Sequence, residues 1–126
     1  MFFQNARIFT PDFHFHLGAF QVENGIFTQV LAQDVPEDAI DLHGATVIPG
    51  LIDVHHHGNS NADFSDGDYE GLKRMAKYLA GVGVTSFAPA SMTLPYDVLE
   101  KAFATARQLV DEDPEGCAVL RGIQME

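Results

Sequence analysis

The chain has 126 residues, 46% of them hydrophobic and 20% charged, a composition that allows one domain of ordinary size and argues against disorder. Asp and Glu number 18 against 7 Lys and Arg, and the resulting net charge of −11 repels phosphate backbones and anionic lipid. The single cysteine excludes an internal disulfide, and no apolar run approaches the roughly 20 residues of a membrane span. We therefore expect a soluble cytoplasmic protein with neither nucleic acid nor a membrane as its partner.

The first part of the chain carries the signals of short β-strands. Residues 20–23 alternate between apolar and polar side chains, and Asn24-Gly25 separates them from a second strand-like run at 26–30. Asn-Gly between two such runs predicts a hairpin, because both turn positions need a positive φ. We expect residues 1–49 to form a small antiparallel β unit.

After Pro49, strands and helices are predicted to alternate. The expected elements are a strand at 51–54, a helix with an apolar face at 72–79, a strand at 84–88 closed by Pro89, a helix with an apolar face at 99–110 and a strand at 118–125. Thr93 is expected to cap the second helix. Short connections in this order imply parallel strands joined by right-handed crossovers.

Three consecutive histidines stand at the carboxyl end of the first expected parallel strand. Strand alternation puts His55 and His57 on one face, about 6.6 Å apart along the strand, and His56 on the other. Two imidazoles on one face can hold a divalent metal ion, and α/β barrels place their active sites at the carboxyl ends of strands. Gly58 would let the backbone turn away without crowding the ion. The alternative is a polar strand end with solvated histidines.

Three segments together resemble a known family. Residues 47–58 are similar to the first barrel strand of the amidohydrolase superfamily, and residues 83–90 and 122–126 narrow the resemblance to the N-acetylglucosamine-6-phosphate deacetylases. The resemblance implies an α/β fold in which residues 50–126 form the first three strands of a partial (β/α)8 TIM barrel. Residues 1–49 would then be part of a small β-sandwich. A complete barrel needs about 250 residues, so the barrel is expected to be incomplete here.

The resemblance also assigns metal ligands. Glu126 matches a glutamate that binds the catalytic divalent metal in this family, and His55 and His57 match a pair that can hold a second metal. The implied cofactor is one or two ions of Zn, Fe, Mn or Co per subunit. A frayed carboxylate is the alternative interpretation of Glu126, and Asp53 is expected to be structural or to support a histidine. No catalytic residue is expected within the chain, because the family's later histidines and its acid–base aspartate match nothing in residues 1–126.

The activity implied by the resemblance is hydrolysis of a C–N amide bond. N-acetylglucosamine 6-phosphate would yield glucosamine 6-phosphate and acetate, with a divalent ion that activates water and polarises the amide carbonyl. The expected partners are this small phosphorylated amino sugar and, for the full-length enzyme, a second subunit in a homodimer. We expect residues 1–126 alone to be inactive, because they supply three ligands and no proton shuttle. Another amide or ring hydrolase of the superfamily and a non-catalytic chain remain as alternatives.

Other chemistry-bearing residues have simpler explanations. His14 and His16 also alternate, but we expect them to be surface residues of the small β unit rather than a metal pair. An EF-hand starting at Asp66 is rejected, because its twelfth position is Lys77, and helix capping accounts better for the local acids. Cys117 begins an expected strand and is predicted to lie in the core.

Overall fold

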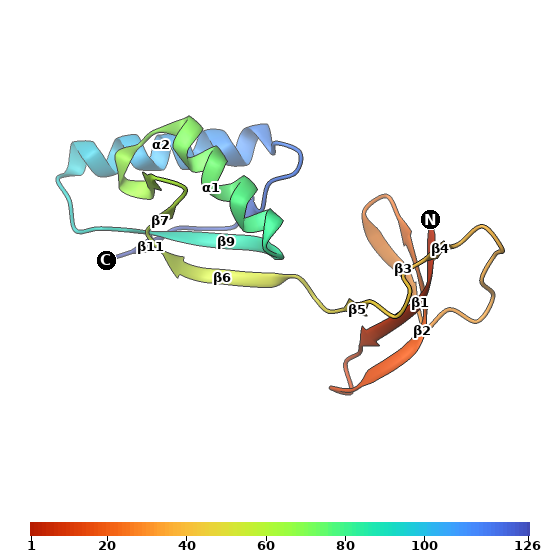
Figure 1. Cartoon of the computed structure of the whole chain (residues 1–126). Helices are drawn as coiled ribbons and strands as arrows, with labels where there is room; N and C mark the ends of the chain where they lie inside the picture. Colours follow the sequence, from red (N-terminus) through yellow and green to blue (C-terminus); the bar gives the residue numbers. More distant parts are fainter. The chain divides into compact units, whose positions relative to one another are not determined.

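The computed structural model describes residues 1–126 and divides into two compact units, Met1–Pro49 and Gly50–Glu126. The architecture is mixed α/β, with two α-helices and three sheets (Figure 1). Each unit buries a hydrophobic cluster of its own. Neither helix is long and apolar enough to cross a membrane.

The first unit is a five-stranded sheet in the order β3-β2-β1-β4, with β5 also paired to β1. The bounds are Phe2–Phe9 for β1, Phe15–Glu23 for β2, Ile26–Val30 for β3, Ile40–Asp41 for β4 and Thr46–Val47 for β5. The predicted hairpin is confirmed, because β2 and β3 pair antiparallel across Asn24 and Gly25, which have φ of 50° and 76°. Ala6, Ile8 and Phe20 form the buried cluster of this sheet.

The prediction of a wholly antiparallel unit is wrong. Strands β4 and β5 both pair with β1 in parallel. The reason is the stretch 31–39, which carries the chain past β2 and β3 to the far side of β1 instead of folding back as another hairpin.

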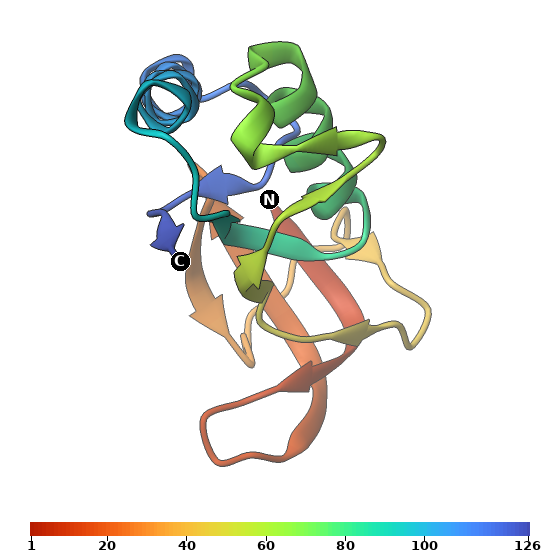
Figure 2. The same cartoon turned by 90° about the vertical axis from the view of Figure 1, so that its left-hand side faces the viewer.

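The second unit has the predicted β-α-β-α-β order with parallel strands. Its elements are β6 Leu51–His56, β7 Gly58–Asn59, β8 Ala62–Asp63, a 3-10 turn Phe64–Asp66, α1 Tyr69–Gly81, β9 Val84–Ser91, α2 Tyr96–Glu112, β10 Val119–Leu120 and β11 Gln124–Met125. Strand β9 is central, with β6 on one side and β10 and β11 on the other, all parallel to it. Helices α1 and α2 lie on the same face of β6 and β9 (Figures 1 and 2).

Two details of the strands differ from the prediction. Strand β9 continues through Pro89, because β11 pairs with Ala90 and Ser91 beyond it. The single strand expected at 118–125 is interrupted, and its two pieces, β10 and β11, pair with successive segments of β9.

Helix α1 follows its sequence pattern closely. The Asp68 side chain caps it by accepting a hydrogen bond from the backbone N–H of Glu70, and the predicted apolar face is buried. That face consists of Leu72, Met75, Ala76 and Leu79. It packs against the buried ring of Phe87 in β9, within one cluster that also includes residues of α2 and β10.

Helix α2 begins later than predicted. Its N-cap is Pro95, with φ of −54°, and no side chain caps the helix, so the assignment of Thr93 as the cap is wrong. The fixed φ of proline suits the start of a helix and makes a capping hydroxyl two residues earlier unnecessary. The buried face contains Leu109, whereas Val110 is exposed.

Candidate metal centre

The carboxyl end of β6 carries both candidate histidines, with His57 directly after the strand. The register between β6 and β9 shifts here, because Asp53 lies opposite Phe87 while His56 lies opposite Pro89. One extra residue of β6 therefore falls between these two pairs, which is the pattern of a β-bulge. Bulges near functional sites redirect side chains that a regular strand would place elsewhere.

The faces of the three histidines are as predicted, but the bulge contributes to the arrangement. His55 and His57 both reach Glu126, while His56 packs against the Phe87 ring with a centroid distance of 5.8 Å. Regular alternation would place Asp53 on the face of His55 and His57. Instead, its carboxylate lies beside His56 on the helix-covered face.

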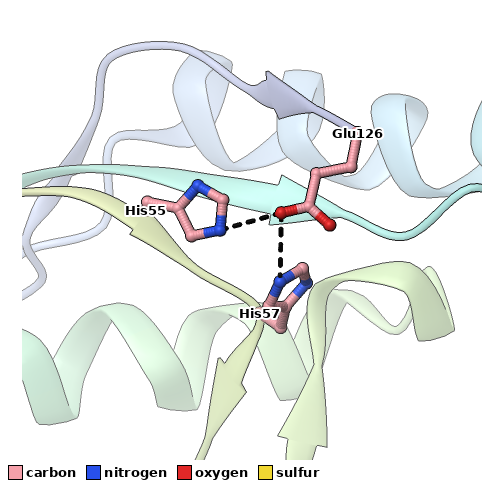
Figure 3. A group of neighbouring side chains, drawn as sticks. All are labelled: His55, His57 and Glu126. Atoms are coloured by element: carbon pink, nitrogen blue, oxygen red, sulfur yellow. Dashed lines mark ion pairs between the residues drawn. The ribbon is translucent and has the colours of Figure 1, made fainter.

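Glu126 follows β11 and completes a group of three side chains (Figure 3). Its Oε1 lies 2.9 Å from Nε2 of His55 and 3.6 Å from Nε2 of His57. The two imidazole rings stand nearly perpendicular, at 83°, with centroids 5.3 Å apart. The structure thus brings together the three residues that the resemblance assigns as ligands.

Thr93 is a neighbour of this group that sequence reasoning missed. Its hydroxyl donates a hydrogen bond to the backbone carbonyl oxygen of Glu126, at 3.1 Å. Thr93 lies in the connection between β9 and α2. A second hydrogen bond holds this connection in place, from the backbone N–H of Met92 to Oγ of Ser65, at 3.2 Å. The available signal was the position of Thr93 just beyond the carboxyl end of a parallel strand, where neighbouring strand ends meet.

The three side chains lie close enough together to converge on a divalent ion. A tetrahedral ion with ligand bonds of about 2.1 Å holds its ligand atoms about 3.4 Å apart. The three potential ligand atoms all lie within 4.8 Å of one another. Two imidazoles and a carboxylate suit Zn²⁺ and related first-row ions. In both histidines Nε2 is the ring nitrogen that lies beside the Glu126 carboxylate, so it is the atom available to an ion at this site.

The other histidine pair, His14 and His16, contacts Asp12 instead of forming a group of metal ligands. Nε2 of His16 lies 2.8 Å from Oδ2 of Asp12, and Nδ1 of His14 lies 2.7 Å from the backbone oxygen of Asp12. Hydrogen bonds from the Thr10 hydroxyl and from His16 hold the pKa of Asp12 well below its usual range. These contacts lie in the connection between β1 and β2, and the potential ligand atoms of His14, His16 and Asp12 do not come together as a group.

The acidic run beyond β7 serves as helix caps, as predicted. Asp63 and Asp66 form a reciprocal capping box around the 3-10 turn, and Asp68 caps α1. Cys117 is partly buried and packs against the core of the second unit, in agreement with its predicted place.

Comparison with known proteins relates this chain to a family, although no family model matches it. The N-acetylglucosamine-6-phosphate deacetylase of Vibrio furnissii is 32% identical over 100 residues, which are 78% of this chain and 25% of that protein. The crystal structure of the N-acetylglucosamine-6-phosphate deacetylase from Pasteurella multocida superimposes with a TM-score of 0.81 at 27% identity, over 96% of this chain and 33% of that one. The chain is a homologue of the N-acetylglucosamine-6-phosphate deacetylases.

The homology to these deacetylases is partial in length, because the chain spans about a quarter to a third of them. The N-acetylgalactosamine-6-phosphate deacetylase of Escherichia coli O157:H7 is 24% identical over 100 residues, 79% of this chain and 26% of that protein. A deacetylase variant from Mycobacterium smegmatis, solved in complex with N-acetyl-D-glucosamine-6-phosphate, shares the fold with a TM-score of 0.81 at 23% identity, over 99% of this chain and 32% of that one.

Proposed function

We propose that His55, His57 and Glu126 are ligands of the divalent metal centre of an N-acetylglucosamine-6-phosphate deacetylase. The observation that carries this proposal is the convergence of the three side chains, two from the end of β6 and one just after β11. Both strands run parallel to β9, so the site lies where the carboxyl ends of parallel strands meet. Barrel hydrolases use this end of the strands for chemistry.

The same proposal includes the fold of the whole enzyme. Residues 50–126 would begin a (β/α)8 barrel, and residues 1–49 would contribute to a small β-sandwich. In support, both helices cover one face of β6 and β9, while Ile52 and Val54 of β6 are exposed. Branched apolar side chains on the helix-free face of parallel strands are what fills the interior of such a barrel.

In the proposed site the ion would supply the Lewis acidity, and the side chains of the protein would hold the ion. A bound divalent ion, whether one or two per subunit and whether Zn, Fe, Mn or Co, would supply Lewis acidity toward water and an amide carbonyl. Glu126 would add negative charge to hold the ion, and the perpendicular rings of His55 and His57 would direct their nitrogens to a common point. We expect residues 1–126 alone to release no acetate, because a departing amine also needs a proton donor.

The substrate proposed for the whole protein is N-acetylglucosamine 6-phosphate, with glucosamine 6-phosphate and acetate as products. A homodimer and a cytoplasmic location belong to the same proposal and rest on the family resemblance. The likeness to an N-acetylgalactosamine-6-phosphate deacetylase makes the epimeric sugar phosphate the second candidate substrate.

Acetate release by the protein expressed from its intact gene tests the function. We expect release from N-acetylglucosamine 6-phosphate to exceed release from the galactosamine epimer. The variant E126Q should lose more than about 100-fold in rate, because even residues that only support metal ligands cost 10- to 100-fold. E115Q, at an exposed position between α2 and β10, is the matched control and should keep its activity. Equal acetate release by E126Q and the wild type would contradict the proposal.

A further inference from the structure

The carboxylate of Asp53 uses its two oxygens for different neighbours. Oδ1 accepts a hydrogen bond from the backbone N–H of His55 at 3.1 Å. Oδ2 lies 3.1 Å from Nδ1 of His56. A single side chain therefore contacts both residues that follow the start of the bulge, from the face opposite Glu126.

The first contact holds the backbone of the bulge. An aspartate that accepts the N–H two residues ahead forms a local turn and fixes the backbone direction between the two residues. Here the fixed segment is the one where β6 carries one residue more than β9. The direction of the His55 side chain depends on this local geometry, because a bulge redirects the residues within it.

The second contact involves a buried imidazole. The His56 side chain is only 15% exposed, and its ring lies against the fully buried ring of Phe87. Neither ring nitrogen of His56 has an aligned hydrogen-bond partner. The Asp53 carboxylate is the charged group beside this ring, and it offsets part of the cost of burying the imidazole. The carboxylate thereby keeps His56 on the helix-covered face, although its two neighbours in sequence, His55 and His57, point to the other face.

We propose that Asp53 is a positioning residue for the metal centre, which it never touches. By holding the His55 backbone and the His56 ring together, it fixes the bulge that directs His55 and His57 toward Glu126. This inference rests on the proposed metal site. Loss of the carboxylate would leave the chain able to fold but would let the two ligand histidines vary in direction, and metal affinity would fall.

Titration of the metal-free protein, expressed from its intact gene, with Co²⁺ tests the inference, because the visible spectrum of bound Co²⁺ reports the geometry of its ligands. D53A should bind Co²⁺ about 10- to 100-fold more weakly than the wild type and show an altered spectrum. D53N keeps an oxygen that can accept the His55 N–H but loses the charge beside His56, so it should weaken binding less. D97N, at an exposed position in the first turn of α2, is the control and should bind as the wild type does.

Circular dichroism and thermal unfolding of each variant separate positioning from folding. A folded D53A with wild-type Co²⁺ affinity and spectrum would overturn the inference, even if its thermal stability were lower. If D53A fails to fold, D53N decides in the same way, and wild-type affinity and spectrum in D53N would overturn the inference. Absence of Co²⁺ binding by the wild-type chain would instead contradict the metal centre itself, and this inference with it.

Discussion

Oε1 of Glu126 lies 2.9 Å from Nε2 of His55, although the strands that lead to these two residues do not pair with each other. Strand β6 and strand β11 each pair with β9, from opposite sides. The contact between Glu126 and His55 therefore reaches across β9, and it forms only when both β6 and β11 are paired with β9. Metal binding at this site should consequently be coupled to folding of the second unit.

This coupling predicts that Zn²⁺ stabilises the chain. An ion that binds only the folded state adds about 2.7 kcal/mol at a concentration 100 times its dissociation constant, and the thermal midpoint should rise accordingly. The double variant H55A/H57A should lose this response. The matched control is H14A/H16A, because those histidines contact Asp12 and belong to no group of three ligands. An equal loss in the control, or none in H55A/H57A, would contradict the assignment.

Gly58 is predicted to be required for the position of His57. A Cβ atom at this position would collide with the carbonyl oxygen of Ala62 and lie 2.9 Å from Cα of Asp63. Both are backbone atoms, so the turn between β7 and β8 must move, at a cost of about 1–3 kcal/mol. Denaturant unfolding of G58A should show this loss, together with weaker Zn²⁺ binding.

The control for the Gly58 prediction is G81A, since a Cβ there would meet nothing within 4 Å. G81A should leave both stability and Zn²⁺ affinity near the wild-type values. If G58A behaved like G81A, the close approach of the two backbone segments would not constrain the site.

Tyr69 is predicted to lose its proton at an unusually high pH. Its hydroxyl donates a hydrogen bond to Glu112, which raises the pKa of Tyr69 to about 12 and lowers the pKa of Glu112. Because the folded-state pKa of Tyr69 is raised, its contribution to stability is complete below the unfolded value of about 10 and disappears as pH rises through about 12. The Glu112 contribution is present above its unfolded value of about 4.3 and is lost as pH falls through its lowered pKa.

Tyrosinate absorbance measures this titration directly. The chain has three tyrosines, and we expect one of them to ionise near pH 12 in the wild type. Y69F should remove that late step, and E112Q should move it toward lower pH. A late step that persists in Y69F would assign it to another residue.

Phe87 is predicted to carry much of the packing in the second unit. It is fully buried within the cluster that joins α1, α2 and β10, and it also supports the ring of His56. F87A should lower the free energy of unfolding by about 3–5 kcal/mol in a denaturant titration. Y96A removes a ring that is 91% exposed, so it should change stability by no more than about 0.5 kcal/mol. Comparable losses in the two variants would contradict the assigned core.

Short sequence patterns were sufficient to predict the turns and helix faces that depend on interactions between residues close in sequence. Asn24 and Gly25 have the positive φ that their hairpin turn needs, and the spacing of Leu72 and Leu79 identified the buried face of α1. The parallel pairing of β4 and β5 with β1 was not predictable in this way, because it depends on how the stretch 31–39 crosses the sheet.

In the candidate site, too, some features follow from the local sequence and others depend on how the strands pair. The order His55, His56, His57 at a strand end was sufficient to predict which two histidines share a face. The bulge after Asp53 was not predictable from period-two alternation, because it arises from the register with β9. The hydrogen bond from Thr93 to Glu126 likewise depends on two segments that only the folded sheet brings together.

The most direct test of the metal centre is a crystal structure of the chain grown with Zn²⁺ and measured at the zinc absorption edge. We predict an anomalous peak about 2.0–2.2 Å from a nitrogen of His55, a nitrogen of His57 and a carboxylate oxygen of Glu126. A Zn²⁺ peak that lies elsewhere, for example at His14 and His16, with none among these three side chains would contradict the proposed site.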